Sequence, residues 1–337
     1  MSLGPQASLL DMTLKEQHAK YLAAGLVYDI WDRLNFPRGT QLIKQAQDHG
    51  FDLPQEVIHI FCGGSNLHGA KDDSGKSDLD ICGIFVEPPE LALGIDRDEH
   101  FISKTAAEGE RNQSGDKDFT IYSLRKWAAM ACKGNPNAPL FLFAPVDPKG
   151  QTTVWDAYIR PSAHLFLAKT TLVGDYAKGG LLGFAKGIWK RAEAALRGKE
   201  YHEAGGFLGF ARNMLYRMQG KRGRGKKGQR PELELKFGYD TKAAMHMIRA
   251  MFEAIELVET GKLAFPNRQV ETLKAIRRGE WSKTVVEQYF EQLESELKKL
   301  VRKSDLRKEI DRAAVSKLVS RAYLAHWRQR EFFKRSQ

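Results

Sequence analysis

The amino-acid sequence predicts an α+β protein, in which a mixed β-sheet with flanking helices is followed by an all-helical C-terminal domain. Runs with strand character fall between residues 56 and 122, whereas residues from about 161 onward show long helical patterns. The composition, 42% hydrophobic and 28% charged residues, is typical of a globular chain. We therefore expect two domains, residues 1–150 with the sheet and residues 151–337 with the remaining helices.

The first domain is expected to begin with helices, because residues 13–48 carry apolar side chains at helical spacing. Strands are then predicted over residues 56–62, 79–86 and 116–122, and a short strand is expected near residues 100–103. In the strand over residues 116–122 polar and apolar side chains alternate, which is typical of a strand with one buried face. These segments supply the sheet of the predicted fold.

The second domain is expected to be helical throughout. Its helical patterns cover residues 161–198, 201–219, 239–260, 267–278, 283–303 and 306–332. Residues 220–230, GKRGRGKKGQR, separate two of these helices and contain too little apolar surface to form part of a core. We expect this segment to be an exposed basic loop.

The positive charge of the chain is concentrated in its C-terminal half. The formal net charge is +11, and residues 220–230 contain six Lys or Arg with no acidic residue. Residues 297–337 contain thirteen Lys or Arg against four acidic residues. This distribution indicates a polyanionic partner such as RNA, bound through its phosphates, although a solvated helix face and an exposed loop would have the same composition. The predicted nucleic-acid contacts in the loop are Lys221, Arg222, Arg224, Lys226 and Lys227.

Cysteine content and hydropathy indicate a cytoplasmic protein. Cys62, Cys82 and Cys132 are odd in number and form no CxxC pair, so we expect reduced thiols rather than a disulfide framework or a zinc site. No apolar run approaches the roughly 18 residues that a membrane span needs. The first residues also lack the basic-then-apolar layout of a signal peptide.

The residues that carry chemistry lie between the first two predicted strands. Gly63 and Gly64 follow the first strand, where backbone N–H groups could approach an anion closely, and Ser65 adds a hydroxyl donor. Asp78 and Asp80 open the second strand with both side chains on one face. Two adjacent carboxylates repel each other, and Mg²⁺ or Mn²⁺ is the hard cation that oxygen ligands favour.

A third carboxylate is expected from the strand over residues 116–122. Asp118 lies on one face of that strand together with Thr120 and Tyr122, and three aspartates of this kind can hold two metal ions. Asp116 lies on the same face and is the alternative third ligand. An exposed polar strand start would also explain these aspartates without any metal.

These motifs resemble a known family. The GGS turn, the segment SDLDICGIFV and a later aspartate resemble the signature of the DNA polymerase β nucleotidyltransferase superfamily. Residues 124–137 and 236–251 are similar to its RNA-ligase-associated RNA repair branch, found in bacteria and their phages. The resemblance implies a polymerase-β-type sheet, two Mg²⁺ ions and transfer of a nucleotidyl group from an NTP with release of pyrophosphate. It matches Gly64 and Ser65 to the phosphate-holding turn and the three aspartates to the metal ligands.

The segment KFGYDTK at residues 236–242 precedes a predicted helix, which Asp240 or Thr241 can cap. The resemblance favours Lys236 and Lys242 as ligands of the triphosphate and Tyr239 as a stacking platform for a base or sugar. An ordinary helix cap with surface lysines is the alternative. His246, on the following helix, is either a packing residue or a catalytic base.

We therefore predict a Mg²⁺-dependent nucleotidyltransferase that binds an NTP and modifies an acceptor hydroxyl, that of the 3′ end of an RNA. Three alternatives stay open. In the first, the acceptor hydroxyl belongs to a protein. In the second, it belongs to another nucleotide, and the product is a signalling oligonucleotide. In the third, the chain is a non-catalytic relative that binds nucleic acid.

Overall fold

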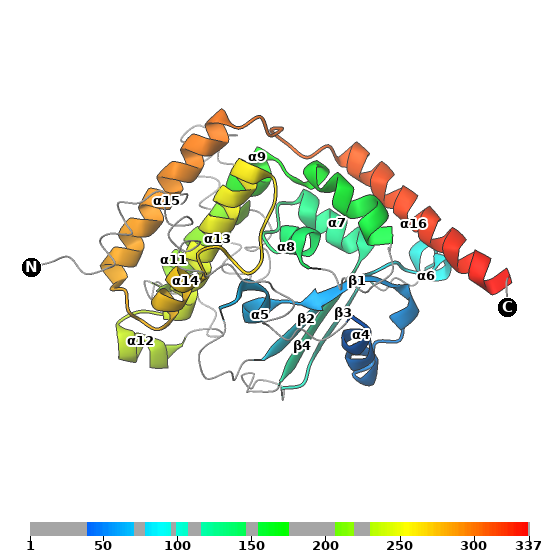
Figure 1. The fold of residues 1–337 in the computed structure, drawn as a ribbon, viewed down its shortest axis with the longest axis horizontal. Coiled ribbons are helices and arrows are strands. Elements are labelled where there is room, and N and C mark those ends of the chain that lie inside the picture. Colours follow the sequence, from blue (N-terminus) through cyan, green and yellow to red (C-terminus); the bar gives the residue numbers. More distant parts are fainter. Residues whose placement is uncertain are drawn as a thin grey trace, which may run out of the picture. The chain divides into compact units, whose positions relative to one another are not determined.

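The computed structural model describes residues 39–70, 78–95, 99–106, 116–145, 154–174, 206–218 and 230–335 (Figure 1). Its contacts divide the chain into two compact units. The sheet unit contains the described residues up to Cys132, Asn137–Phe166 and those from Asp311 onward, and the helical unit contains Lys133–Pro136 and Leu167–Ile310. The predicted helices before residue 39 and the predicted nucleic-acid ligands Lys221, Arg222, Arg224, Lys226 and Lys227 lie outside the described residues.

The sheet unit is built on four strands. They are β1 (Val57–Cys62), β2 (Leu79–Phe85), β3 (His100–Lys104) and β4 (Lys117–Ser123), in the spatial order β1-β2-β4-β3. β1 is antiparallel to β2, β2 is parallel to β4, and β3 is antiparallel to β4. The sheet is therefore mixed, and the predicted α+β fold is confirmed.

The two faces of the sheet are covered by different elements. On one face the core contains Ile81, Phe85, Phe119 and Ile121 together with Leu42 of helix α4 (Gly39–Asp48). On the other face aromatic side chains of β1 and β4 contact α8 (Ala138–Phe143) and η2 (Trp155–Ile159). Because side chains alternate along a strand, Asp80 and Asp118 project from this second face.

Shorter helices complete the sheet unit. They are η1 (Pro54–Glu56), α5 (Gly64–His68), α6 (Pro89–Leu93), α7 (Leu124–Cys132) and η3 (Arg160–Phe166). Trp127 of α7 is fully buried and donates a hydrogen bond from Nε1 to the Ala138 carbonyl at 3.1 Å. This contact ties α7 to the start of α8.

The C-terminal helix α16 (Arg312–Arg335) packs within the sheet unit, so it crosses the predicted boundary near residue 150. His326 Nε2 lies 2.6 Å from Oε2 of Glu56, and Arg330 lies 3.0 Å from the other oxygen of that carboxylate. Burial alone would raise the pKa of Glu56, but the hydrogen bond and charge of His326, together with Arg330, lower it below its usual value.

A second buried carboxylate, that of Glu87, also holds helix α16 in place. Its side chain accepts hydrogen bonds from Arg125 at 3.2 Å and from the Tyr323 hydroxyl, and its backbone carbonyl accepts one from Trp327 Nε1 at 2.9 Å. Burial and Glu87 raise the pKa of Tyr323, so its hydroxyl stays protonated and donates. Trp327 therefore contacts the protein itself.

The helical unit is arranged around one long helix, α13 (Thr241–Thr260), whose side chains are mostly buried. Helices α11 (Gly206–Met218), α14 (Val270–Arg277) and α15 (Lys283–Lys303) pack against it (Figure 1). The unit also contains α9 (Lys169–Val173) and α12 (Pro231–Phe237). Among the described residues, no helix is long and apolar enough to cross a membrane.

Candidate active site

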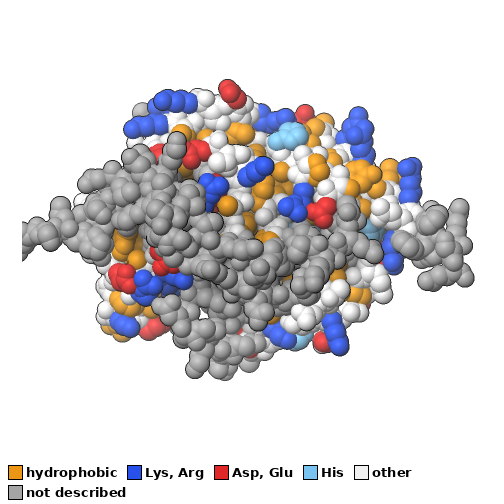
Figure 2. Space-filling view, in the orientation of Figure 1, with side chains coloured by type: hydrophobic (Ala, Val, Ile, Leu, Met, Phe, Trp, Pro, Cys, Tyr) orange, Lys and Arg blue, Asp and Glu red, His pale blue; other side chains and the backbone are white. Residues whose placement is uncertain are grey.

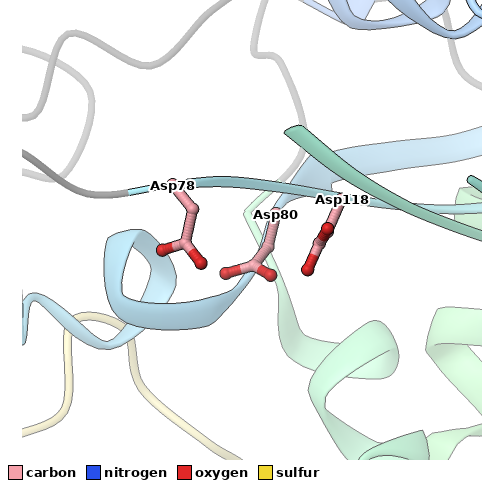
Figure 3. Close-up of side chains that lie close together, drawn as sticks. All are labelled: Asp78, Asp80 and Asp118. Atoms are coloured by element: carbon pink, nitrogen blue, oxygen red, sulfur yellow. The ribbon is translucent and has the colours of Figure 1, made fainter. Parts of the chain in front are cut away.

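Asp78, Asp80 and Asp118 lie together at one edge of the sheet, with their side chains on the same side of it (Figure 3). Each is half-buried, and each offers an oxygen that lies within 4.8 Å of those of the other two. Asp80 and Asp118 are direct partners in the parallel β2–β4 ladder, which explains why their carboxylates are adjacent. Oxygens on opposite sides of a bound Mg²⁺ are about 4.2 Å apart, so small side-chain movements would suffice for these three to share an ion.

The glycine turn holds β1 against the start of β2. Gly63 donates its backbone N–H to the Asp80 carbonyl at 2.8 Å. Gly64 has a φ of +56°, and a Cβ at this position would lie 1.7 Å from Oδ2 of Asp80. The turn therefore requires glycine for two reasons, the left-handed backbone and the space that the Asp80 carboxylate occupies.

Ser65 and Asn66 follow this turn in the short helix α5, and Ser65 is half-buried. The Asn66 amide donates to the backbone carbonyl of Asp78 at 3.4 Å, so it contacts the residue that precedes β2. Sequence reasoning did not include Asn66. Its position directly after the GGS turn is the only signal that could have suggested it.

The two candidates for the third carboxylate have different surroundings. Asp118 lies in the cluster, and one of its oxygens is 3.3 Å from Nζ of Lys104 on the neighbouring strand β3. Asp116 accepts a hydrogen bond from the Thr105 hydroxyl at 3.0 Å, and that hydroxyl also accepts one from the backbone of Lys117. The geometry therefore favours Asp118 as the ligand. Lys104 was not predicted, because its proximity depends on the pairing of β3 with β4.

Cys82 lies two residues beyond Asp80 on the same strand. Burial, with the negative charges of Asp80, Cys62 and Asp118, raises the pKa of its thiol, so the thiol remains protonated at neutral pH. None of the three cysteines, all of which lie in the described part of the chain, is in a disulfide. Carboxylate oxygens are therefore the ligand type that this edge of the sheet offers to a metal, and they suit Mg²⁺ or Mn²⁺.

The comparison with protein families supplies the deciding observation. The model of the RNA repair pathway DNA polymerase beta family (RlaP) matches residues 40–322. The chain belongs to this family. The predicted membership in a polymerase-β-type nucleotidyltransferase family of the RNA repair branch is confirmed. No curated protein matches the chain.

The match to the RlaP family spans the three aspartates and the segment at residues 236–242 in the helical unit. Lys236, at the end of α12, is exposed and lies 4.9 Å from the ring centroid of Phe237. Lys242 is half-buried in the first turn of α13. Asp240 is the cap of this helix, accepting a hydrogen bond from the Ala243 N–H at 2.9 Å.

Two further residues in this region of the RlaP-family chain are not exposed. Tyr239 is 1% exposed and donates its hydroxyl to the Trp281 carbonyl at 2.7 Å, so its ring packs inside the helical unit. His246 is half-buried. Burial and the charges of Arg249, Lys242, Arg230 and Arg277 hold the pKa of His246 well below its usual value. Its imidazole is therefore neutral at pH 7 and a weak base.

Proposed function

We propose that the chain is a Mg²⁺- or Mn²⁺-dependent nucleotidyltransferase that transfers NMP from an NTP to the 3′ hydroxyl of an RNA and releases pyrophosphate. The observation that carries this proposal is the cluster of three carboxylates on adjacent strands, with oxygens within 4.8 Å of one another. Membership in the RlaP family supports the reaction class, and the place of this family in RNA repair supports RNA as the acceptor.

The three aspartates fit a divalent metal because their like charges, brought together by strand pairing, are stabilised by a cation between them. Asp78 and Asp80 would hold both ions, and Asp118 would hold the one nearer the acceptor. When bound, such ions supply charge neutralisation at the triphosphate and lower the pKa of an attacking hydroxyl. The Gly63 and Gly64 backbone would then keep the Asp80 carboxylate in position.

Three residues are proposed as ligands of the triphosphate from the resemblance to the family. Ser65 offers a hydroxyl donor directly after the glycine turn, and Lys236 and Lys242 offer two cations. Tyr239 would act indirectly, because its buried ring fixes the segment that connects these lysines. Because the ring of Tyr239 is buried, its exposure gives no support to the predicted stacking of this ring on the nucleotide.

The acceptor is proposed to be RNA because of the charge of the chain. The net charge is +11, and residues 220–230 contain six Lys or Arg. On the face drawn in Figure 2, Lys and Arg side chains occur at many separate points, with apolar and acidic side chains between them. Exposed Lys and Arg side chains can bind a polyanion through its phosphates without reading its sequence.

Product analysis tests the proposal. The protein would be incubated with Mg²⁺, each NTP labelled at the α-phosphate, and an RNA with either a free or a blocked 3′ hydroxyl. We expect label on the RNA with the free hydroxyl only. Label on the protein or in a small oligonucleotide would show that the acceptor is wrong. Absence of transfer to any acceptor would favour a non-catalytic nucleic-acid-binding protein.

A further inference from the structure

The edge strand β3 extends the aspartate side of the sheet beyond Asp118. In the antiparallel β3–β4 ladder Lys104 is the partner of Asp118, and Ile102 is the partner of Thr120. Directly paired residues of neighbouring strands point to the same side of a sheet. Ile102 and Lys104 therefore lie on the side of the sheet that carries the aspartates, and we call these two residues the β3 surface.

The β3 surface is open to solvent. Phe101 points to the opposite side of the sheet, where its ring centroid lies 5.4 Å from that of Phe51 and 6.1 Å from that of Phe119. Ile102 is 55% exposed, and the side chain of Lys104 is 59% exposed. A ligand that covers an exposed isoleucine gains the free energy of burying its apolar surface. This edge of the sheet thus offers an apolar contact next to a cation.

The order of the strands gives the two sides of the aspartate cluster different neighbours. The glycine turn and Ser65 follow β1, which pairs with β2 and hence lies beside Asp80. On the other side of β2 come β4 with Asp118 and then β3 with Lys104. The glycine turn and the β3 surface are therefore on opposite sides of the carboxylates.

This order indicates the direction from which an acceptor approaches. In nucleotidyl transfer the attacking hydroxyl and the leaving pyrophosphate lie roughly in line, on opposite sides of the phosphorus that is attacked. Because the triphosphate is proposed to lie at the glycine turn, the acceptor hydroxyl must come from the β3 side. This step rests on the proposed function.

Lys104 contacts the carboxylate that lies nearest to this approach. Its Nζ is 3.3 Å from Oδ2 of Asp118. Lys104 would lose part of its attraction to Asp118 once that carboxylate binds a metal ion, because like charges repel. The lysine side chain is long and flexible, so its ammonium can then turn to a phosphate without any movement of the strand.

We propose that the β3 surface binds the 3′-terminal part of the acceptor RNA. Lys104 contacts a phosphate of the RNA backbone, and Ile102 packs against the sugar or base of a terminal nucleotide. A single-stranded end suits this surface, because its unstacked nucleotides expose apolar faces that a duplex buries. Lys104 thus neutralises Asp118 in the free protein and binds the acceptor in the complex.

Fluorescence anisotropy of a labelled single-stranded RNA tests Lys104 without any transfer reaction. Binding to the full chain would be measured without NTP, at a fixed micromolar Mn²⁺ concentration, over a series of salt concentrations. We expect Lys104→Gln to weaken binding about fivefold and to lower the slope of log Kd against log salt by about 0.7, the value for one phosphate contact. Lys104→Arg should keep the slope of the unsubstituted chain.

The matched control for Lys104 is Lys117→Gln. Lys117 directly precedes Asp118 on β4, so its side chain points to the opposite side of the sheet. This variant should change RNA affinity by about twofold or less and leave the slope unchanged. The proposal is overturned if Lys117→Gln and Lys104→Gln have equal effects.

Ile102→Ala tests the apolar contact separately. We expect it to weaken RNA binding about threefold, because less apolar surface is covered in the complex. Ile95→Ala is the control, since Ile95 is 100% exposed and follows α6 rather than lying on β3. Equal RNA affinities of the two variants would contradict the role of Ile102.

A purely structural role of Lys104 gives a different result. If Lys104 only holds Asp118 in place, Lys104→Gln weakens Mn²⁺ binding in a calorimetric titration and leaves RNA affinity unchanged, which overturns the proposal. We expect instead that Lys104→Gln binds Mn²⁺ at least as tightly as the unsubstituted chain, because a competing cation has been removed.

Steady-state transfer distinguishes failure of this proposal from failure of the proposed function. Lys104→Gln should raise the KM for RNA about fivefold and leave the KM for NTP unchanged. A rise confined to the KM for NTP would place Lys104 at the triphosphate and overturn the proposal. If no RNA is extended but RNA binding still depends on Lys104, the proposed function is refuted and the β3 surface stands as an RNA-binding site. Label on a protein acceptor, with RNA binding independent of Lys104, would refute both.

Discussion

Replacing Gly64 by alanine tests the link between the glycine turn and the candidate metal ligands. The added Cβ would lie 1.7 Å from Oδ2 and 2.6 Å from Cγ of Asp80, far inside van der Waals contact. The Asp80 carboxylate must therefore leave its place in the cluster. In addition, alanine at a φ of +56° costs about 1 kcal/mol of stability.

Gly261→Ala is the matched control for the backbone cost alone. Gly261 has a φ of +67°, and a Cβ there would meet no atom within 4 Å. Both variants should lose about 1 kcal/mol, which lowers the melting temperature by roughly 2 °C in a chain of this size. Only Gly64→Ala should also weaken Mn²⁺ binding, by about tenfold or more, because one of the carboxylate ligands is displaced.

Calorimetric Mn²⁺ titration and nucleotidyl transfer would be measured on both variants beside the unsubstituted chain. If Gly64→Ala binds Mn²⁺ and transfers NMP as well as Gly261→Ala does, the turn does not act through Asp80. The steric part of the reasoning would then be refuted.

Three further substitutions give distinct outcomes. Asp118→Asn should reduce transfer about 10³-fold, whereas Asp116→Asn, whose side chain contacts Thr105, should change it little; equal losses in radiolabel assays would contradict the assignment of the third ligand. Because His326 and Arg330 hold the pKa of Glu56 below its usual value, Glu56 stabilises the fold above pH 4.5 and this contribution is lost as the pH falls further. Glu56→Gln should therefore flatten the acid limb of the melting profile, and an unchanged acid limb would exclude this contribution. Burial raises the pKa of Glu253 from 4.5 to about 7, so its contribution to stability falls as the pH rises through that window. The difference in melting temperature between Glu253→Gln and the unsubstituted chain should shift in favour of the variant between pH 5 and 8, and a constant difference would argue against the raised pKa.

The strands could be predicted from the sequence because each has a clear local signature. Alternation along residues 116–122 and the apolar run before Gly63 are properties of the chain itself. The order β1-β2-β4-β3 and the position of Lys104 beside Asp118 depend on which strands pair, so they had no local signal.

The packing of helix α16, like the pairing of the strands, had no local signal in the sequence. Its helical pattern was evident in the sequence. Its packing in the sheet unit, however, depends on the contact between Glu56 and His326, which are 270 positions apart. A charged residue such as Glu56 gives no sequence signal that it will be buried against a distant partner. The predicted boundary near residue 150 therefore does not follow the division of contacts in the structure.

The candidate site could be predicted in part. The spacing of Asp78 and Asp80 placed both side chains on one face, and the structure brings them together with Asp118. The reason for Gly64 was incomplete, because the sequence suggested a backbone that approaches an anion but not the contact with Asp80. The resemblance to the family favoured Tyr239 as a residue that stacks on a nucleotide, whereas the burial of its ring is a tertiary property that the sequence motif does not reveal.

The divalent-metal dependence of NMP transfer tests the central claim most directly. Transfer to RNA would be measured against Mg²⁺ concentration for the unsubstituted chain and for Asp80→Asn, with EDTA as the zero-metal point. We expect transfer that requires Mg²⁺ and falls about 10³-fold in Asp80→Asn. Transfer that persists in EDTA, or that Asp80→Asn leaves intact, would contradict the assignment of the three aspartates as the catalytic metal site.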